Sequence, residues 1–317
     1  GKGLIKSSIR GDDLFILCDV GNYSCTYNYF GRENSMSPDD HYQDLKRIIQ
    51  AAGGKAHRIN IIMPSLYGGR QHRRNYRESL DCAVALQELQ SMGVSNILTF
   101  DAHDPRVQNA VPLMGLDNII PSYQVLKAMF KNLSDFRPDK DHFMIISPDE
   151  GAINRNMYYA SVLGVNLGMF YKRRDYSTII DGRNPIVAHE YMGNDVAGKD
   201  VFIADDIISS GESMLDIAVE LKKRKANKIY CYATYPIFTN GLEAFNKAYA
   251  DGIIDGVFGT NLTYRTPELL SSPWFYEVDC SKYIAYFIAS LNHDKSISQV
   301  IDPHTKIEAL LKKYGIK

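Results

Sequence analysis

The chain has 317 residues, of which 45% are hydrophobic, and its 36 basic residues nearly balance its 37 acidic residues, giving a formal net charge of -1. Such a chain is long enough for two domains with ordinary hydrophobic cores, and its composition excludes a disordered or collagen-like protein. The near-zero charge supplies no general attraction to nucleic acids or anionic membranes, so a small-molecule partner is favoured over either.

The five cysteines are scattered, odd in number and without the spacing of a metal site, which favours free thiols in a reducing compartment. No apolar run approaches the ~20 residues of a membrane span, and no charged-then-apolar leader opens the chain. We therefore expect a cytoplasmic protein.

In the first half of the chain, short β-rich runs alternate with amphipathic helical patterns, as in proteins built from parallel sheets covered by helices. The apolar periodicity predicts helices over 41–52 and 79–92, with Gly93 as the C-terminal signal of the second. Strands are predicted at 14–18, 58–63 and 96–100. The pattern indicates the α/β class.

The second half repeats this alternation, with predicted strands at 143–147, 166–171, 201–204 and 228–235 and helices at 151–163, 213–224 and 242–250. The polar stretch 132–141, which contains Pro138, is the best linker candidate, so we place a domain boundary near residue 140. The expected parts are an N-terminal domain over 1–140, a C-terminal domain over 141–297, and a tail over 298–317 with a helix from about Pro303.

The strongest local motif runs from Val201 to Ser213, where an apolar strand is followed by two aspartates, Ser-Ser-Gly and a helix start. Free N–H groups at a helix N-terminus and hydroxyl donors favour a phosphate group there. The carboxylates suit sugar hydroxyls or Mg²⁺. The motif predicts a sugar-phosphate site, although Asp, Ser and Gly also cap ordinary helices. Its residues are Asp205, Asp206, Ser209, Ser210, Gly211 and Ser213.

This motif resembles the ribose-5-phosphate loop of two families, the type I phosphoribosyltransferases and the ribose-phosphate pyrophosphokinases, which make phosphoribosyl pyrophosphate (PRPP). The two families share a fold but catalyse different reactions. Ser209 and Glu212 replace the Asp and Gly common in the pyrophosphokinases, and Ser209 is closer to the transferase pattern.

Two motifs in the first half resemble the pyrophosphokinases specifically. The loop after the strand at 58–63 concentrates arginines, a composition that grips polyphosphate, and its Arg70-Gln71 pair matches the family's ATP-contacting pair, with His72 in place of the usual Asp. After the strand at 96–100, Asp101 and His103 match an Asp-x-His element, which the resemblance associates with ATP and the metal through His103, supported by Asp101.

Two further motifs complete the resemblance. The Ser-Pro-Asp turn at 147–149 implies that Asp149 faces the ribose or its metal, with Ala152 in place of a family glycine. The cationic run after the strand at 166–171 describes a loop that closes over a polyanion. By resemblance, its Lys172 and Arg174 stabilise the transferring phosphates, so the catalytic residues implied are Lys172, Arg174 and His103.

Together these motifs resemble the ribose-phosphate pyrophosphokinase family over nearly the whole chain. The resemblance implies two tandem phosphoribosyltransferase-like domains, each a mainly parallel sheet flanked by helices. It also implies transfer of a diphosphoryl group from ATP to ribose 5-phosphate, Mg²⁺ held by His103 and Asp149, and a dimeric or hexameric homo-oligomer. The stretch 21–40 has no counterpart in the family pattern, and it is expected to form an interface or a nucleotide contact.

Two alternatives stay open. The Ile-Ser-Ser-Gly loop at 208–211 is compatible with a phosphoribosyltransferase that consumes PRPP, although such enzymes lack the Arg-Gln and Asp-x-His elements. The other alternative is a catalytically silent, pyrophosphokinase-like regulatory subunit. Such a subunit is expected to lose the cations near Lys172, and this chain keeps them.

Overall fold

A computed structural model describes residues 1–174 and 186–316, and it describes only the backbone at 172–174, 186–189 and 299. The chain forms two compact units. Unit 1 comprises residues 1–121, 261–264 and 280–301, and unit 2 comprises 122–260, 265–279 and 302–317. Within the described ranges, none of the helices combines the length and the apolar character needed to cross a membrane.

This division differs from the boundary expected near residue 140. Helix α3 (Ser122–Asn132) lies before that position but packs against strand β13 (Phe275–Val278) and helix α10 (His304–Lys313), which belong to unit 2. The tail over 298–317 is likewise split, because the short helix α9 (Ser298–Ile301) belongs to unit 1 and α10 to unit 2. The expected tail helix therefore exists, but its packing assigns it to the C-terminal unit.

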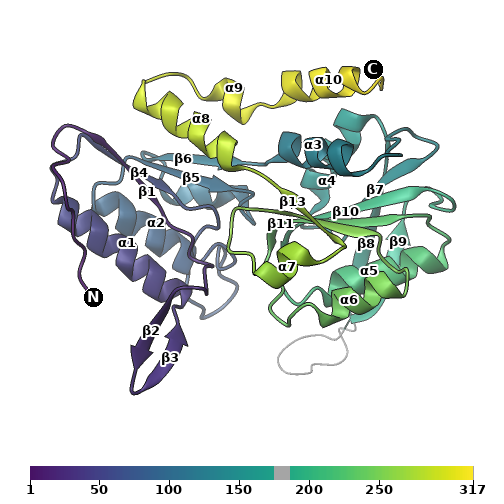
Figure 1. Ribbon diagram of the computed structural model, residues 1–317, viewed down its shortest axis with the longest axis horizontal. Coiled ribbons are helices and arrows are strands. Elements are labelled where there is room, and N and C mark those ends of the chain that lie inside the picture. Colours follow the sequence, from purple (N-terminus) through teal and green to yellow (C-terminus); the bar gives the residue numbers. More distant parts are fainter. Residues whose placement is uncertain (175–185, 317) are drawn as a thin grey trace. The chain divides into compact units, whose positions relative to one another are not determined.

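Unit 1 is built on a four-stranded parallel sheet in the order β1-β4-β5-β6, whose strands are Asp13–Leu17, Arg58–Ile62, Asn96–Phe100 and Gly115–Ile119 (Figure 1). Helices α1 (Pro38–Ala52) and α2 (Asp81–Ser91) share a core with one face of this sheet. Phe100 points to the other face, because strand side chains alternate, and its ring lies 6.4 Å from that of Tyr283 on helix α8 (Ser281–Asn292). Helices therefore contact both faces, as the α/β pattern predicts.

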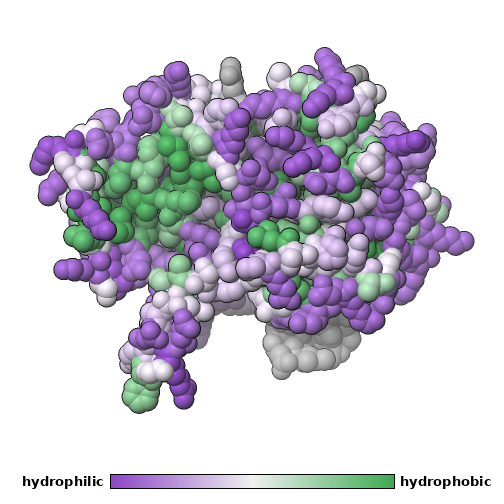
Figure 2. Space-filling model, viewed as in Figure 1, coloured by the Kyte–Doolittle hydropathy of each residue, from purple (hydrophilic) through white to green (hydrophobic). Residues whose placement is uncertain are grey.

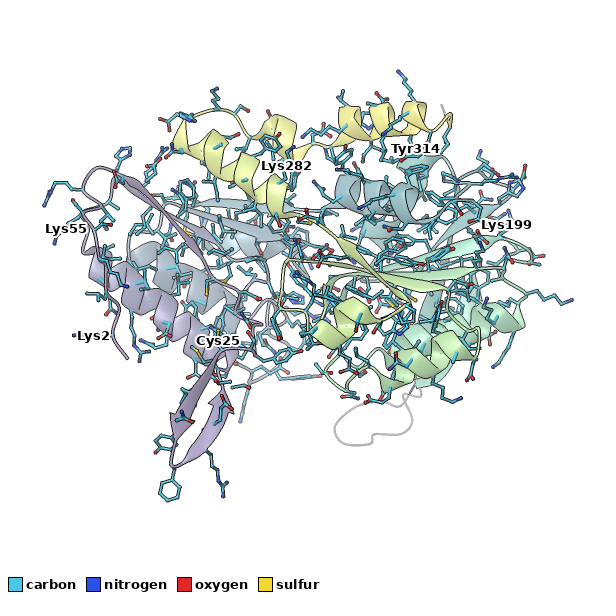
Figure 3. All side chains as sticks on the ribbon, in the orientation of Figure 1. Lys2, Cys25, Lys55, Lys199, Lys282 and Tyr314 are labelled. Atoms are coloured by element: carbon cyan, nitrogen blue, oxygen red, sulfur yellow. The ribbon has the colours of Figure 1, made fainter. Side chains whose placement is uncertain are left out.

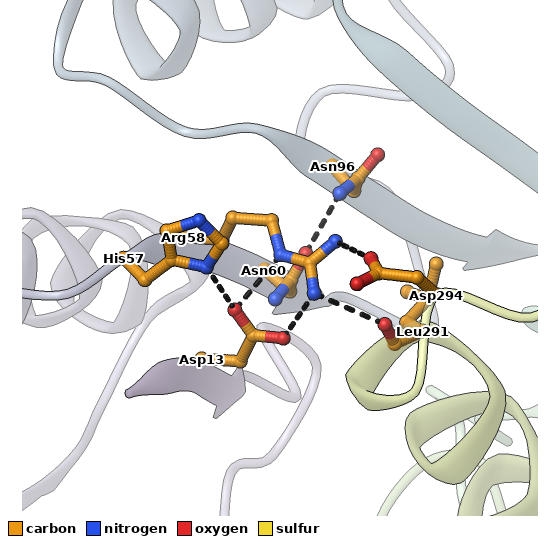
Figure 4. Close-up of polar contacts among 7 residues, drawn as sticks. All are labelled: Asp13, His57, Arg58, Asn60, Asn96, Leu291 and Asp294. Carbon is orange, nitrogen blue, oxygen red and sulfur yellow. Dashed lines mark hydrogen bonds and ion pairs between the residues drawn. The ribbon is translucent and has the colours of Figure 1, made fainter. Parts of the chain in front are cut away.

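The ion pairs around Arg58 connect three elements of unit 1 (Figure 4). Arg58 donates to Asp13 on the neighbouring strand through Nε at 2.8 Å and also through Nη2. Its Nη1 donates to Asp294 at 2.5 Å, and Nη2 also donates to the carbonyl of Leu291 at 3.2 Å, at the end of α8. Hydrogen bonding by Arg58 lowers the pKa of Asp13. The network fastens the edge strand and α8 to β4.

The stretch 21–40, for which no element was predicted, contains an antiparallel hairpin of strands β2 (Thr26–Tyr29) and β3 (Arg32–Ser35) and the start of α1. Phe30 and Gly31 at its turn both have positive φ angles, 52° and 71°, as a tight two-residue hairpin turn requires. Phe30, in this turn, is 92% exposed. Figure 2 shows apolar side chains gathered on unit 1 over β1 and β4, where Leu17 is 65% exposed.

Unit 2 is built on a seven-stranded sheet in the order β13-β12-β11-β10-β7-β8-β9 (Figure 1). All its pairings are parallel except that of β8 with β9. Besides β13, its strands are β7 (Phe143–Ser147), β8 (Asn166–Arg174), β9 (Ile186–Met192), β10 (Asp200–Ile208), β11 (Ile229–Pro236) and β12 (Gly256–Thr260). The remaining helices are α4 (Ile153–Leu163), α5 (Glu212–Lys223), α6 (Glu243–Ala250) and α7 (Pro267–Ser271).

The two faces of this sheet are covered by different helices because successive side chains of each strand alternate. On one face, Val201 and Ile203 of β10 join the core residues of α5 and α6. On the other face, Phe202 of β10 and Tyr232 of β11 stack with ring centroids 6.0 Å apart, and both rings contact Tyr159 of α4. The central strands, buried on both faces, therefore read as continuous apolar runs, which explains why they were predictable.

Candidate active site

In unit 1, the predicted ATP-binding residues follow two neighbouring parallel strands, β4 and β5, whose carboxyl ends meet at one edge of the sheet. The loop after β4 is held to the end of β5, since Thr99 Oγ1 and the Phe100 amide both donate to the carbonyl of Pro64, at 2.9 and 3.0 Å. Arg70 and Gln71 lie further along this loop with exposed side chains. They are free of the core and accessible to a ligand.

The structure brings His72 and His103 together, with ring centroids 5.3 Å apart. His72 Nε2 lies 3.5 Å from the Asp104 carboxylate. The same carboxylate accepts hydrogen bonds from the amide and guanidinium of Arg106, which lower the pKa of Asp104 to about 2. Burial lowers the pKa of His72, and the charge of Asp104 opposes that shift. The short helix η1 (Pro105–Ala110) begins directly after Asp104, so this carboxylate anchors the loop that carries His103.

Asp101 is 3% exposed and has a φ angle of +42°, which is uncommon for a residue other than glycine. Its amide donates to the carbonyl of Ile119 on β6 at 2.8 Å, and the next amide, of Ala102, donates to Asn118 Oδ1 at 2.9 Å. Such strained backbone persists only where neighbouring contacts fix it, and it is concentrated at functional sites. Asp101 therefore shapes the turn on which His103 is carried, and its role in supporting His103 stays a prediction.

In unit 2, strand β10 does not end before the two aspartates, as the sequence suggested, but continues through both to Ile208. Its pairing with β7 ends at Ile203, whereas its pairing with β11 continues to Ile208. The strand is extended because β11 supplies backbone partners beyond the polar residues, which local composition does not reveal. Asp205 and Asp206 therefore lie on a segment with β11 on one side and no β7 partner on the other.

The carboxyl of Asp205 is in an unusual electrostatic environment. Burial raises the pKa of Asp205 well above its ordinary value, and the neighbouring Asp206 and the charge of Asp149 raise it further. The Arg155 guanidinium opposes this shift, with Nη1 lying 3.6 Å from Asp205 Oδ1. Arg155 is only 9% exposed. Three acids and one buried arginine thus share this part of unit 2.

The turn carrying Asp149 is fastened to β10 by a buried side chain, Asn156, in the first turns of α4. Asn156 is fully buried and donates to the carbonyls of Ala152, at 2.9 Å, and Ala204, at 2.8 Å, and to Ser147 Oγ at 3.3 Å. Asp149 itself accepts a hydrogen bond from the Ala152 amide at 3.2 Å. Asn156 therefore fixes the spacing between the Ser-Pro-Asp turn and the strand that carries Asp205.

The predicted phosphate loop connects β10 to α5. Gly211 precedes the first residue of α5 with a φ angle of +82°, and a Cβ at this position would lie 2.3 Å from the ring of Phe245. The carbonyls of Ile208 and Ser209 are held by the loop after β11, because the Thr239 amide donates to Ser209 at 2.9 Å and the Phe238 amide to Ile208 at 3.1 Å. Ser209, Ser210 and Ser213 surround a helix N-terminus, which favours an anion.

The remaining predicted residues are placed only in part. The backbones of Lys172 and Arg174 belong to β8, and their side chains lie outside the described residues. His103 belongs to unit 1 and Asp149 to unit 2. Among the described residues, no group of three or more His, Cys, Asp and Glu side chains is arranged to hold a metal ion. The metal assignment to His103 and Asp149 therefore stays a prediction.

Arg155, Asn156 and Asp104 were not predicted as site residues. Arg155 and Asn156 lie in a helix whose sequence resembles an ordinary amphipathic segment, and only tertiary packing brings them to β10. A buried arginine is uncommon, but its burial is known only from the packing and not from the sequence.

A predominantly parallel sheet, flanked by helices and carrying an acid-bearing strand that leads through a Ser-Gly loop into a helix, defines a protein of the phosphoribosyltransferase-like class. The family models agree in detail: the N-terminal domain of ribose phosphate pyrophosphokinase matches residues 2–93, and the phosphoribosyl transferase domain matches residues 116–253. The chain belongs to the ribose-phosphate pyrophosphokinase family.

Individual relatives are similar over most of their length. The chain is 28% identical to a ribose-phosphate pyrophosphokinase of Shewanella oneidensis over 300 residues, covering 93% of this chain and 85% of the relative. It is 27% identical to one of Chlorobaculum tepidum over 303 residues, covering 94% and 85%. The crystal structure of phosphoribosylpyrophosphate synthetase from Mycobacterium smegmatis has the same fold, with a TM-score of 0.72 at 20% identity over 92% of this chain and 86% of that one.

Proposed function

We propose that this chain is a ribose-phosphate pyrophosphokinase, which transfers the diphosphoryl group of ATP to the anomeric hydroxyl of ribose 5-phosphate to give PRPP and AMP. The observation that carries the proposal is the strand, loop and helix formed by β10, residues 209–211 and α5, with Asp205 and Asp206 before the loop. This arrangement supports a sugar-phosphate substrate on grounds that do not depend on the relatives. Their shared name supports the reaction.

Each substrate has a proposed set of partners. The hydroxyls and amides of the loop from Ser209 to Ser213 bind the 5-phosphate, and Asp205 and Asp206 accept hydrogen bonds from the ribose hydroxyls. Arg70 and Gln71 bind ATP, whose phosphates suit the guanidinium.

The reaction is a displacement at the β-phosphorus of ATP. The anomeric oxygen forms a bond to this phosphorus and gives up its proton to solvent. The bond between the β-phosphorus and the oxygen that bridges it to the α-phosphorus breaks, so AMP leaves with that oxygen. Such a step needs positioning and charge neutralisation more than covalent help. Lys172 and Arg174 supply this neutralisation in the proposal, and His103 acts on the triphosphate.

The acids of unit 2 have the chemistry that a divalent cation prefers. Asp149 and Asp206 both raise the pKa of Asp205, so negative charge accumulates there, and Mg²⁺ prefers such oxygen ligands with phosphates and water completing its shell. We propose that Asp149 helps hold Mg²⁺, with His103 on the ATP side. The ion would neutralise phosphate charge.

The experiment that tests the function measures AMP and PRPP formation from ATP, ribose 5-phosphate and Mg²⁺, omitting each in turn. AMP that appears only with ribose 5-phosphate, together with PRPP, is the expected result. A folded protein that makes no AMP but consumes PRPP would be a transferase, and one that does neither would be a regulatory subunit. Analytical ultracentrifugation tests the proposed homo-oligomer, and cell fractionation tests the proposed cytoplasmic location.

The assignment of Lys172 has its own test. Reversing the charge with Lys172→Glu should lower turnover by a factor of about 10² or more while leaving the free energy of unfolding nearly unchanged, because the role is electrostatic. Lys295→Glu makes the same charge change at an exposed site of unit 1 and should leave turnover nearly unchanged. Retained turnover in Lys172→Glu contradicts the assignment.

A further inference from the structure

A basic groove lies between helices α3 and α10 of unit 2, which pack against each other (Figure 1). It has a volume of about 450 Å³. Its walls carry four lysines and two tyrosines, namely Lys127, Lys131, Lys306, Lys313, Tyr123 and Tyr314. We call this the lysine groove. It involves none of the residues proposed above for ATP or ribose 5-phosphate.

The helical spacing places the lysines in rows along the groove. Lys127 and Lys131 are four residues apart on α3, and Lys306 and Lys313 are two turns apart on α10, so each pair lies on one face of its helix. Like charges four residues apart, as at Lys127 and Lys131, repel each other and weaken the helix. The arrangement therefore carries a small energetic cost in the free protein, which a bound anion would remove.

The packing fixes both helices in this orientation. Leu310 and Leu311 of α10 are buried, and Val125 and Met129 of α3 are fully buried, so neither helix can rotate its lysines away without exposing apolar surface. Tyr314, labelled in Figure 3, stacks on Phe130 of α3 with ring centroids 4.5 Å apart. The groove is thus a built feature of the two helices.

The lining of the groove contains no carboxylate. Some lysines outside the groove do have acidic partners, as in Lys46 with Glu88 at 2.9 Å and Lys247 with Asp251 at 2.6 Å. In the part of the chain that the structure describes, neither Lys127 nor Lys131 forms an ion pair, and the contact of Lys313 is with the ring of Tyr314 at 5.6 Å.

The acid within α10, Glu308, is engaged with another residue. Glu308 lies outside the groove lining and pairs with His304 at 3.3 Å. The local excess of positive charge is notable in a chain whose total charge is -1.

We propose that the lysine groove binds a small polyanion, a soluble compound with two or more adjacent phosphate groups. Ammonium groups are standard phosphate partners, and those of Lys127, Lys131 and Lys313 supply three positive charges toward the roughly four negative charges of a triphosphate group at neutral pH. The groove volume falls within the range of small-molecule sites, roughly 300–1,000 Å³, and Tyr123 and Leu310 supply apolar wall area. The observations favour a small ligand over a nucleic acid, because the basic surface is confined to two short helices.

The test uses inorganic tripolyphosphate as the probe and isothermal titration calorimetry on the full chain. The groove variant combines Lys127→Gln, Lys131→Gln and Lys313→Gln, and its control combines Lys282→Gln, Lys295→Gln and Lys312→Gln, an equal charge change outside the groove. Lys312 is a stringent control because it lies on α10 itself.

The wild type and the control should share a binding event that is weakened at least about tenfold in the groove variant, since three charge contacts are lost. This event should weaken with added NaCl, whereas turnover in the groove variant should remain that of the wild type.

Equal tripolyphosphate binding by the groove variant and its control overturns the proposal. It is also overturned if the groove variant loses binding only to a 20-nucleotide RNA or only to vesicles containing phosphatidylinositol bisphosphate. Thermal unfolding excludes a folding defect, because removing repelling lysines should leave the groove variant at least as stable as its control. A groove variant that binds tripolyphosphate normally but lacks AMP formation would also count against the proposal, since these lysines would then serve the reaction.

Discussion

Gly211 offers a quantitative test of how the phosphate loop is held. Its φ angle of +82° is costly for any residue with a side chain, about 1–2 kcal/mol for alanine. The added Cβ would also lie 2.3 Å from Cε2 of Phe245, a fully buried ring stacked on Trp274 at 5.6 Å. Overpacking of this kind costs a further ~1–3 kcal/mol. Gly211→Ala should therefore lower the free energy of unfolding of unit 2 by about 2–5 kcal/mol.

Gly198 supplies the matched control. It lies in the same unit with a φ angle of +74°, and nothing lies within 4 Å of an added Cβ. Gly198→Ala should therefore show the backbone cost alone, ~1–2 kcal/mol, so the difference between the two variants isolates the contact with Phe245. Only Gly211→Ala should also weaken binding of ribose 5-phosphate, because the helix N-terminus would move.

The assay is urea unfolding followed by the fluorescence of Trp274, the single tryptophan of the chain, which reports on unit 2. The free energies of unfolding of the two variants are compared with the same slope against urea concentration. If Gly211→Ala were no more destabilising than Gly198→Ala, the Phe245 ring would move away from the added Cβ at no energetic cost. The argument that close packing fixes the loop would then be refuted.

Two further predictions concern charged pairs. Arg58 lowers the pKa of Asp13 in the folded protein below 3.8. The ionised Asp13 carboxylate therefore contributes its full stabilisation to the folded state above that pH, and this contribution disappears as the pH falls through the lowered folded-state pKa. The stability difference between wild type and Asp13→Asn should be constant above about pH 5 and shrink below about pH 4 in acid unfolding, and a difference unchanged at pH 2 would contradict this. Arg155→Gln should lower the free energy of unfolding by about 1–3 kcal/mol and raise the KM for ribose 5-phosphate, because Asp205 loses its charged partner. Arg155→Lys keeps the positive charge and should keep most of the affinity for ribose 5-phosphate. An unchanged KM in Arg155→Gln would show that this arginine does not act on the ribose site.

The strands were predictable where burial on both faces makes them continuous apolar runs, as at β7 and the first half of β10. Strands were missed where the segment is polar or rich in glycine and is extended only because a neighbouring strand pairs with its backbone. The second half of β10 contains two aspartates, and β12 contains two glycines in five residues, yet both pair with β11. In each case the backbone partner, which lies far away in the sequence, decides the structure.

The candidate site likewise has parts that the sequence predicts and parts that it does not. The loop from Ser209 to Ser213 was predictable because strand, acids, glycine and helix are contiguous. The pairing of His72 with His103 and the approach of Arg155 to Asp205 join separate segments, so no local pattern reveals them. The division into units differs from the boundary expected near residue 140 for a related reason, since α3 belongs to unit 2 through contacts with elements from the end of the chain.

The antiparallel pairing of β8 with β9 has a consequence for how the family can diversify. Arg174 of β8 is paired with Ile186 of β9, so the residues that flank 175–185 in the sequence are cross-strand neighbours. We expect a replacement segment of different length between Arg174 and Ile186 to leave the register of the other strands unchanged. Doubling the length of this segment costs only about 0.6 kcal/mol of loop-closure entropy. The segment that follows Lys172 and Arg174 can therefore be replaced, in evolution or by design, without changing the rest of the sheet.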